Sequence, residues 1–333
     1  MLNTDIFKFE FVDRTEERRL IDSYLMDFSS NLSYILWIHG KRGTGKSYFL
    51  TEYVMSKKNF TSIYVNIEIE NISSGAYLKA FISQLNKAAN LKFTNYIRAN
   101  YKSMATIGQK AVNMILNMTD LDDIGLDELS SSITNYFISK RDEKENTVVV
   151  IKKYIFEALK KCENMVFLLD NFSQCDPNSL DVIVSVIHEV IYNARIRFLI
   201  CTTDDDLKNR FDIKSILAEK IPNKSIVISP FQQKQLFARM LERTFELNEA
   251  DIKLLSQTFE LCHGLPQRFK EILINLYTIQ GITIDGDKAQ FVLDAFNQQL
   301  IKDELAFEMD ALCQKQKGAK IILQIIALWG NPI

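Results

Sequence analysis

Cysteine and histidine are scarce in this chain of 333 residues, which contains five of the first and three of the second. No two cysteines have the C-x-x-C spacing of zinc sites and the histidines are few, so no zinc site is expected. Several cysteines lie in or beside apolar segments, which is typical of reduced, packed thiols in a cytosolic protein. The five are Cys162, Cys175, Cys201, Cys262 and Cys313.

Long apolar runs and an excess of one charge are also missing. No apolar run reaches the 18 residues typical of a membrane-spanning helix, and no signal peptide is recognisable. Lysine and arginine (40) nearly balance aspartate and glutamate (42), so composition does not indicate a dedicated nucleic-acid or membrane partner. The chain is 47% hydrophobic and can bury a core, and its length predicts roughly two to three domains. We expect a cytoplasmic protein.

The segment Gly40–Ser47, GKRGTGKS, is the most informative part of the sequence. It fits G-x-x-x-x-G-K-[ST], the phosphate-binding loop of nucleoside triphosphatases. The apolar run 34–38 predicts a buried strand before the loop, and the periodicity of 47–53 predicts a helix after it. A loop between a strand and a helix presents unpaired backbone N–H groups to phosphate oxygens, and the helix dipole favours the anion. The sequence therefore predicts a site for ATP or ADP with Mg²⁺.

Individual residues of the loop have distinct predicted roles. The glycines allow the tight backbone path, the Lys46 ammonium reaches the β- and γ-phosphates, and the Ser47 hydroxyl is a ligand for Mg²⁺. The residues expected to contact the nucleotide in this segment are Gly40, Gly43, Thr44, Gly45, Lys46, Ser47 and Tyr48.

Apolar segments alternate with helical periodicity along the first two thirds of the chain. Such alternation predicts an α/β fold, a doubly wound parallel sheet with helices on both faces. Residues 73–161 are expected to be mostly helical, with breaks near 119–125 and 140–146 and an apolar core helix at 103–118. The strands are predicted at 34–38, 62–67, 165–169, 196–201 and 225–228.

The pattern changes at Pro230, after which no further strand is expected. Residues 1–228 are predicted to form the nucleotide-binding domain, with the helical insertion at about 73–161. Residues 229–300 are predicted to form a helical lid subdomain. Residues 301–333 are expected to begin a further, winged-helix-like domain within which the sequence stops. The helices of the lid are predicted at 232–245, 250–262 and 267–280, with another from 287 to about 312.

In such a sheet, ligands bind at the carboxyl ends of the strands, and Asp170 directly follows the predicted strand 165–169. The spacing from the phosphate loop leaves room for one extra strand, and Asp170 is expected to hold Mg²⁺ opposite Ser47. The next residue is Asn171, which cannot accept a proton at neutral pH. Asp176 lies nearby, with a reach that the sequence leaves open. The predicted catalytic set is Lys46, Asp170, Asn171 and Asp176, and we expect hydrolysis to be slow or to depend on a group from elsewhere.

Thr202 and Thr203 end the predicted strand 196–201. A hydroxyl at this place could contact the γ-phosphate, or it could cap the following turn. Both alternatives are open at the level of sequence.

The segment 263–268, HGLPQR, forms a predicted corner between two helices. Gly264 and Pro266 are residues that such a junction needs for its own sake. The alternative is a lid over the nucleotide, in which Arg268 or His263 points at the phosphates.

Together these segments resemble the STAND class of signalling ATPases, which are related to the AAA+ P-loop proteins. Residues 11–17, FVDRTEE, are similar to the family's F-V-G-R-x-x-E motif, with Asp13 in place of glycine. Residues 168–180, LLDNFSQCDPNSL, are similar to its Walker B stretch L-L-D-D-x-x-x-x-D-P-x-S-L, with Asn171 in place of the second aspartate. Residues 264–266 match its G-x-P motif.

The resemblance covers about residues 9–300 and implies a regulatory switch. It implies that Val12 and Arg14 flank the adenine and that Pro266 lies against it. Such proteins rest as ADP-bound or empty monomers, exchange for ATP on a signal, open, and oligomerise to activate an effector. Many bacterial members act in antiviral defence and others in transcriptional control. The implied partners are further copies of the chain or an effector or sensor protein. The arginine that several relatives place after the fourth strand is absent from 202–206, TTDDD.

Two other functions are compatible with the same motifs. A DNA-handling AAA+ ATPase, such as an initiator or transposition regulator, also has a G-x-P-x-R corner, although no basic strip is evident near a strand end. Salt-dependent DNA binding would separate this function from the switch. The third possibility is a structural module that merely holds a nucleotide. The presence of Asn171 in place of a carboxylate leaves this possibility open.

Overall fold

The computed structural model describes residues 12–26, 28, 32–67, 75–93, 95–96, 141–242, 249–285 and 288–291. The chain divides into two compact units, which are described separately below. One holds residues 14–42 and 46–229, and the other holds residues up to 13, residues 43–45 and residues from 230 onward. The helix expected at 103–118 and the domain expected at 301–333 lie outside the described residues.

The larger unit is built on a five-stranded sheet in the order β2-β3-β4-β1-β5, and every neighbouring pair is parallel. This confirms the predicted doubly wound parallel α/β fold. Strand β4 lies between β1 and β3, which is the extra strand that the spacing predicts. The strands are β1 (Ile35–His39), β2 (Thr61–Val65), β3 (Met165–Leu169), β4 (Ile196–Cys201) and β5 (Asn223–Val227).

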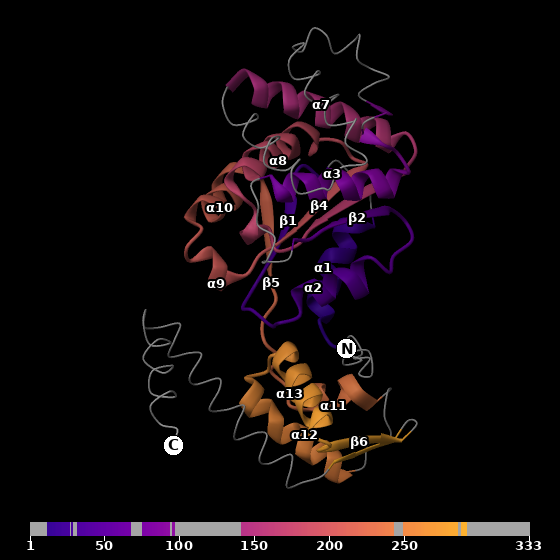
Figure 1. Ribbon diagram of the computed structural model, residues 1–333, viewed down its shortest axis with the longest axis vertical. Coiled ribbons are helices and arrows are strands. Elements are labelled where there is room, and N and C mark those ends of the chain that lie inside the picture. Colours follow the sequence, from indigo (N-terminus) through magenta and orange to yellow (C-terminus); the bar gives the residue numbers. More distant parts are fainter. Residues whose placement is uncertain are drawn as a thin grey trace, which may run out of the picture. The chain divides into compact units, whose positions relative to one another are not determined.

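Helices cover both faces of this sheet. Figure 1 shows α3, α7 and α8 on one side, and α1 and α2 on the other. The expected break at 140–146 is wrong, because α7 begins at Arg141; arginine, lysine and glutamate are good helix formers, so a run of charges does not end a helix. The elements are α1 (Thr15–Leu25), α2 (Lys46–Tyr48) continuing into the π-helix η2 (Phe49–Val54), α3 (Ala76–Ala89), α7 (Arg141–Leu159), η5 (Phe172–Gln174), α8 (Pro177–Val190), α9 (Asp204–Leu207), α10 (Phe211–Ser215) and η6 (Ile216–Lys220).

The core of this unit lies on both faces of the central strands, because successive side chains of a strand point to opposite faces of the sheet. All residues of β3 and β4 are buried, because each face of the sheet carries helices. On one face Phe167 stacks between Phe81 of α3, at 5.1 Å, and Phe198 of β4, at 4.8 Å. The opposite face carries Cys201 at the end of β4, and it is the face on which Arg197 lies over the ring of Tyr24 in α1. The strand ends are therefore held by a rigid layered core.

The second unit contains α11 (Gln235–Glu242), α12 (Glu249–Cys262), α13 (Pro266–Thr278) and the antiparallel pair β6 (Ile282–Asp285) and β7 (Lys288–Phe291). The expectation that no strand follows Pro230 is wrong, and β7 occupies residues that were expected to begin a helix. The sequence contains the signal, because Ile-Thr-Ile precedes Asp285-Gly286, a typical hairpin turn. The hydrophobic core of the second unit includes Phe237, whose ring stacks on that of Phe269 with 4.2 Å between the ring centroids. No helix among the described residues is long and apolar enough to cross a membrane.

Candidate nucleotide-binding site

The loop between β1 and α2 has a backbone that only glycine fits at its first position. Gly40, Gly43 and Gly45 have φ of 152°, 81° and 90°, in the region that other residues rarely adopt. A Cβ atom on Gly40 would lie 2.3 Å from the carbonyl oxygen of Ile228. The glycines thus shape a narrow cradle at the carboxyl end of β1, in which backbone groups can approach a phosphate closely.

Lys46 is folded back onto this cradle. Its Nζ donates to the carbonyl oxygens of Gly40 (3.0 Å) and Lys41 (2.7 Å), and only 7% of the residue is exposed. Burial lowers the pKa of Lys46 from its ordinary value, while the nearby thiol of Cys201 and the carboxylates of Asp204 and Asp170 act in the opposite direction. A buried ammonium ion above a glycine cradle suits the phosphates of a nucleotide.

The residues around Lys46 differ in exposure. Thr44 is buried, with 1% exposed, whereas Ser47 and Tyr48 at the start of α2 are exposed. Ser47 is therefore an exposed residue at the start of α2, the place from which a serine of this motif can reach Mg²⁺.

Asp170 lies directly after β3 and is almost completely buried, with 1% exposed. Its Oδ1 accepts from the backbone N–H of Asn171 (2.9 Å), and its Oδ2 accepts from the hydroxyl of Tyr64 (2.8 Å). Burial and, after it, the nearby charge of Asp170 raise the pKa of the Cys201 thiol well above its ordinary value. Among the described residues no cluster of three His, Cys, Asp or Glu could hold a metal alone. A magnesium ion would therefore need Asp170, Ser47 and the phosphates together, which matches the ligands that Mg²⁺ takes in nucleotide sites.

Asn171 follows Asp170 in a left-handed backbone conformation, with φ of 48°, which asparagine tolerates. Its Nδ2 donates to Oδ1 of Asn66, the residue after β2, at 2.8 Å. The side chain at the position of a possible general base is thus an amide held by a second amide.

Asp176, whose reach the sequence left open, lies at the start of α8. Its Oδ1 accepts from the backbone N–H groups of Ser179 (3.0 Å) and Gly75 (2.9 Å). Asp176 is the N-cap of α8, and it also binds Gly75, the N-cap residue of α3. These contacts give Asp176 a helix-capping role, and the function proposed below does not use it as a catalytic group.

Thr202 and Thr203 are buried at the end of β4. The Thr202 hydroxyl accepts from the indole N–H of Trp37 on the neighbouring strand β1, at 2.8 Å. Thr203 is the N-cap of α9, but its side chain makes no capping hydrogen bond. The capping alternative therefore does not explain the Thr203 hydroxyl.

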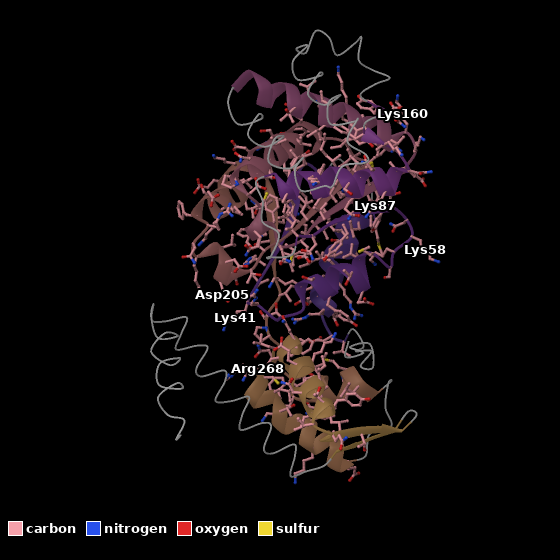
Figure 2. All side chains as sticks on the ribbon, in the orientation of Figure 1. Lys41, Lys58, Lys87, Lys160, Asp205 and Arg268 are labelled. Carbon is pink, nitrogen blue, oxygen red and sulfur yellow. The ribbon has the colours of Figure 1, made fainter. Side chains whose placement is uncertain are left out.

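Acidic residues follow Thr203 beside the phosphate loop. The backbone N–H of Asp204 donates to the carbonyl of Gly40 (3.1 Å), and its carboxylate lies 2.9 Å from Nδ1 of His39. The ammonium of Lys208 holds the pKa of Asp205 below its ordinary value, and Lys41 of the loop adds to this effect (Figure 2). At the place after β4 where several STAND relatives have an arginine, this chain therefore has carboxylates. Asp204 is paired with His39, and Asp205 is paired with Lys208.

The N-terminal motif divides between the two units. Asp13, which stands where the resembled family has glycine, has φ of 59°, and Arg14 has φ of 67°. Arg14 is buried and forms an ion pair with Glu17 at 3.5 Å. Val12 packs against the hydrophobic core of the second unit.

The corner between α12 and α13 is fixed by contacts within the second unit. His263 and Gly264 have φ of 50° and 68°, and a Cβ atom on Gly264 would lie 2.2 Å from the carbonyl oxygen of Phe231. Pro266 begins α13, as proline often does at the first helical position. Arg268 is half-buried in the first turn of this helix. The positive φ values and the close approach of the Phe231 carbonyl thus fix the backbone path of this junction.

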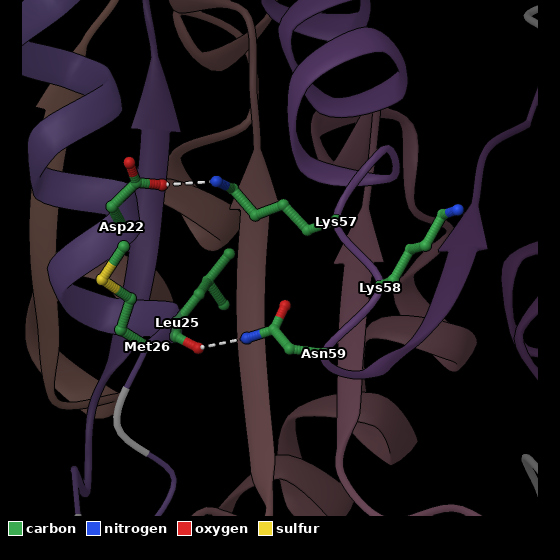
Figure 3. A pocket seen from close by; sticks show the side chains of 6 residues that line it. All are labelled: Asp22, Leu25, Met26, Lys57, Lys58 and Asn59. Atoms are coloured by element: carbon green, nitrogen blue, oxygen red, sulfur yellow. Dashed lines mark hydrogen bonds and ion pairs between the residues drawn. The ribbon is translucent and has the colours of Figure 1, made fainter.

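A separate cavity of about 300 Å³ lies at the end of α1, where Asn59 precedes the amino end of β2 (Figure 3). Lys57 bridges it through an ion pair with Asp22 (2.7 Å), and Nδ2 of Asn59 donates to the carbonyl of Leu25 (3.3 Å). The phosphate loop follows the carboxyl end of β1. This cavity is therefore not the nucleotide site.

Sequence reasoning missed Tyr64 and Cys201. Both lie near the carboxyl ends of strands that flank β3, and the Tyr64 hydroxyl contacts Asp170. For Tyr64, the available signal was a polar aromatic residue within the predicted strand 62–67 of a parallel sheet.

Comparison with known proteins identifies the family. Residues 17–259, well over half of the chain, match the KAP family P-loop domain. A comparison with curated proteins gives no match. Among solved structures, the chain is similar to Cdc6p from Pyrobaculum aerophilum, with 17% identity, a TM-score of 0.47, and coverage of 84% of this chain and 66% of that chain. The predicted P-loop NTPase is confirmed, and the chain belongs to the KAP family of P-loop NTPases.

Proposed function

We propose that this chain is a nucleotide switch that behaves like the STAND class. It binds ATP and ADP, hydrolyses ATP slowly, and couples the bound nucleotide to opening and self-association, in signalling or antiviral defence. The observation that carries the proposal is the combination of a complete phosphate loop with Asn171, an amide, beside the buried Asp170. Such a site holds a nucleotide and its metal but lacks the carboxylate that normally activates water.

Within this proposal the protein groups bind and orient the nucleotide. The Lys46 ammonium exchanges its bonds to the Gly40 and Lys41 carbonyls for phosphate oxygens. Ser47 and Asp170 hold Mg²⁺, which when bound neutralises charge on the β- and γ-phosphates. The Thr203 hydroxyl, buried at the end of β4, is the proposed contact to the γ-phosphate. In this proposal, residues at the carboxyl ends of the strands distinguish ATP from ADP by contacting the γ-phosphate, which only ATP has.

The assembly state tests the switch. The protein should elute as one copy with ADP and as a complex of at least two copies with ATP and Mg²⁺, because only ATP supplies a γ-phosphate to be read. Size-exclusion chromatography with light scattering measures this mass. Lys46→Ala should keep a single mass under both conditions. An unchanged mass of the wild type with either nucleotide would contradict assembly as the output, while nucleotide binding itself could stand.

The corner 263–268 is proposed to close over the bound nucleotide, with Pro266 against the base and Arg268 or His263 at the phosphates. A ligand that binds only the folded state stabilises it by about 2.7 kcal/mol at a hundredfold excess over its Kd. ADP should therefore raise the melting temperature. Pro266→Ala and Arg268→Ala should each reduce this rise while changing the melting temperature of the free protein little.

Differential scanning fluorimetry with and without ADP measures both quantities. Asn275→Ala serves as the matched control, because Asn275 is exposed on the same helix. If both corner variants respond to ADP as the wild type does, the corner is a helix junction only.

A further inference from the structure

Tyr64, on strand β2, contacts Oδ2 of Asp170 through a side-chain hydrogen bond. The hydroxyl donates at 2.8 Å, and the residue is half-buried one place before the end of the strand. A tyrosine hydroxyl is protonated at neutral pH, so the phenol acts as a donor to the carboxylate.

The residue that follows Asp170 supplies the donor to the other carboxylate oxygen. The backbone N–H of Asn171 donates to Oδ1 of Asp170 at 2.9 Å, and the Asn171 side chain donates through Nδ2 to Oδ1 of Asn66, the residue after β2, at 2.8 Å. Each carboxylate oxygen therefore accepts one hydrogen bond, from strand β2 on one side and from the main chain after β3 on the other.

Different contacts fix the main chain of Asp170. The hydroxyl of Tyr77, on α3, donates to the Asp170 carbonyl oxygen at 2.7 Å, and the Asp170 N–H donates to the carbonyl of Val65 at 2.8 Å. Removal of the Tyr64 hydroxyl should consequently release the carboxylate and leave the backbone in place.

We propose that Tyr64 is a positioning residue that aims the Asp170 carboxylate at the magnesium ion of a bound nucleotide. The inference rests on the proposed function. A carboxylate has about four lone-pair sites, and the donors from Tyr64 and Asn171 engage one on each oxygen. The remaining lone pairs are then held in one direction. Residues that orient a metal ligand in this way typically change metal affinity 10–100-fold when they are lost.

Tyr64→Phe tests the proposal, because it removes the hydroxyl and keeps the ring. Isothermal titration calorimetry gives the affinity for ADP in EDTA and over a series of free Mg²⁺ concentrations. The variant should bind ADP in EDTA as the wild type does. The Mg²⁺ concentration that gives half of the Mg²⁺-dependent gain in affinity should rise about 10- to 100-fold. Electron paramagnetic resonance of Mn²⁺ in the presence of ADP gives an independent measure of metal binding.

Two variants separate this role from a general loss of order. Tyr77→Phe removes the hydroxyl that contacts the Asp170 main chain, and Tyr154→Phe removes one that contacts Asn86 at 2.6 Å in the core. Both should show the Mg²⁺ dependence of the wild type, and melting temperatures report on folding.

An unchanged Mg²⁺ dependence in Tyr64→Phe would overturn the proposal, as would a wild-type ADP affinity that does not respond to Mg²⁺. A shift of equal size in Tyr77→Phe would also overturn it, because the effect would then belong to the backbone. A wild type that binds no ADP even in EDTA would instead refute the proposed nucleotide site.

Discussion

Lys46→Ala should reduce the affinity for ADP and ATP by about 100-fold or more. The ammonium can make two hydrogen bonds to phosphate oxygens in place of those it makes to the Gly40 and Lys41 carbonyls. A hydrogen bond to a charged group contributes about 1.5–3 kcal/mol, and about 1.4 kcal/mol corresponds to a tenfold change in affinity. Two such bonds therefore account for the expected loss. Calorimetry with each nucleotide measures it.

Lys41→Ala is the matched control, because it removes a charge of the same sign from the same loop but from an exposed position. This variant should retain ADP affinity within about tenfold, as expected for a screened surface charge. Circular dichroism should show that Lys46→Ala keeps the fold. Wild-type affinity in Lys46→Ala would refute the assignment of the phosphate loop.

The isolated wild type should hydrolyse ATP more slowly than about 1 s⁻¹, the low end of ordinary enzyme turnover. Asn171 offers an amide where a carboxylate would accept the proton of the attacking water, and general base catalysis contributes about 10²–10⁴-fold. Asn171→Asp should therefore raise the rate about 100-fold or more. Aspartate tolerates the left-handed backbone at this position, where φ is 48°.

The substitution has one local requirement. Asn171 donates to Oδ1 of Asn66, so an aspartate requires the Asn66 amide to rotate and present its NH₂ group instead. Steady-state phosphate release measures the rate, with Lys46→Ala as the blank and Asn171→Ala as the control that adds no base. A wild type faster than about 1 s⁻¹ would show that another group activates water. An Asn171→Asp rate equal to that of Asn171→Ala would remove this position from consideration as a base.

Local patterns decided most of the fold. The phosphate loop could be placed because its glycines, lysine and serine lie within eight consecutive residues between a strand and a helix. Asp170 could be placed because an apolar strand precedes it, and parallel strands bring their carboxyl ends to one edge. The hairpin β6–β7 departs from the expectation of a helix from 287 onward, and the turn Asp285-Gly286 is the local pattern that favours it.

The sequence by itself determined which chain segments meet at the nucleotide site, since the strand ends follow from periodicity and a parallel sheet brings its carboxyl ends to one edge. Only the tertiary structure decided what each polar side chain does there. Asp176 caps α8 and binds Gly75, about 100 residues earlier, and Tyr64 reaches Asp170 because β2 and β3 pair in one register. Hydrogen bonds depend on ångström distances between segments far apart in the chain. A one-residue change of register would turn Tyr64 to the other face of the sheet, and no local pattern near Tyr64 or Asp176 encodes that alignment.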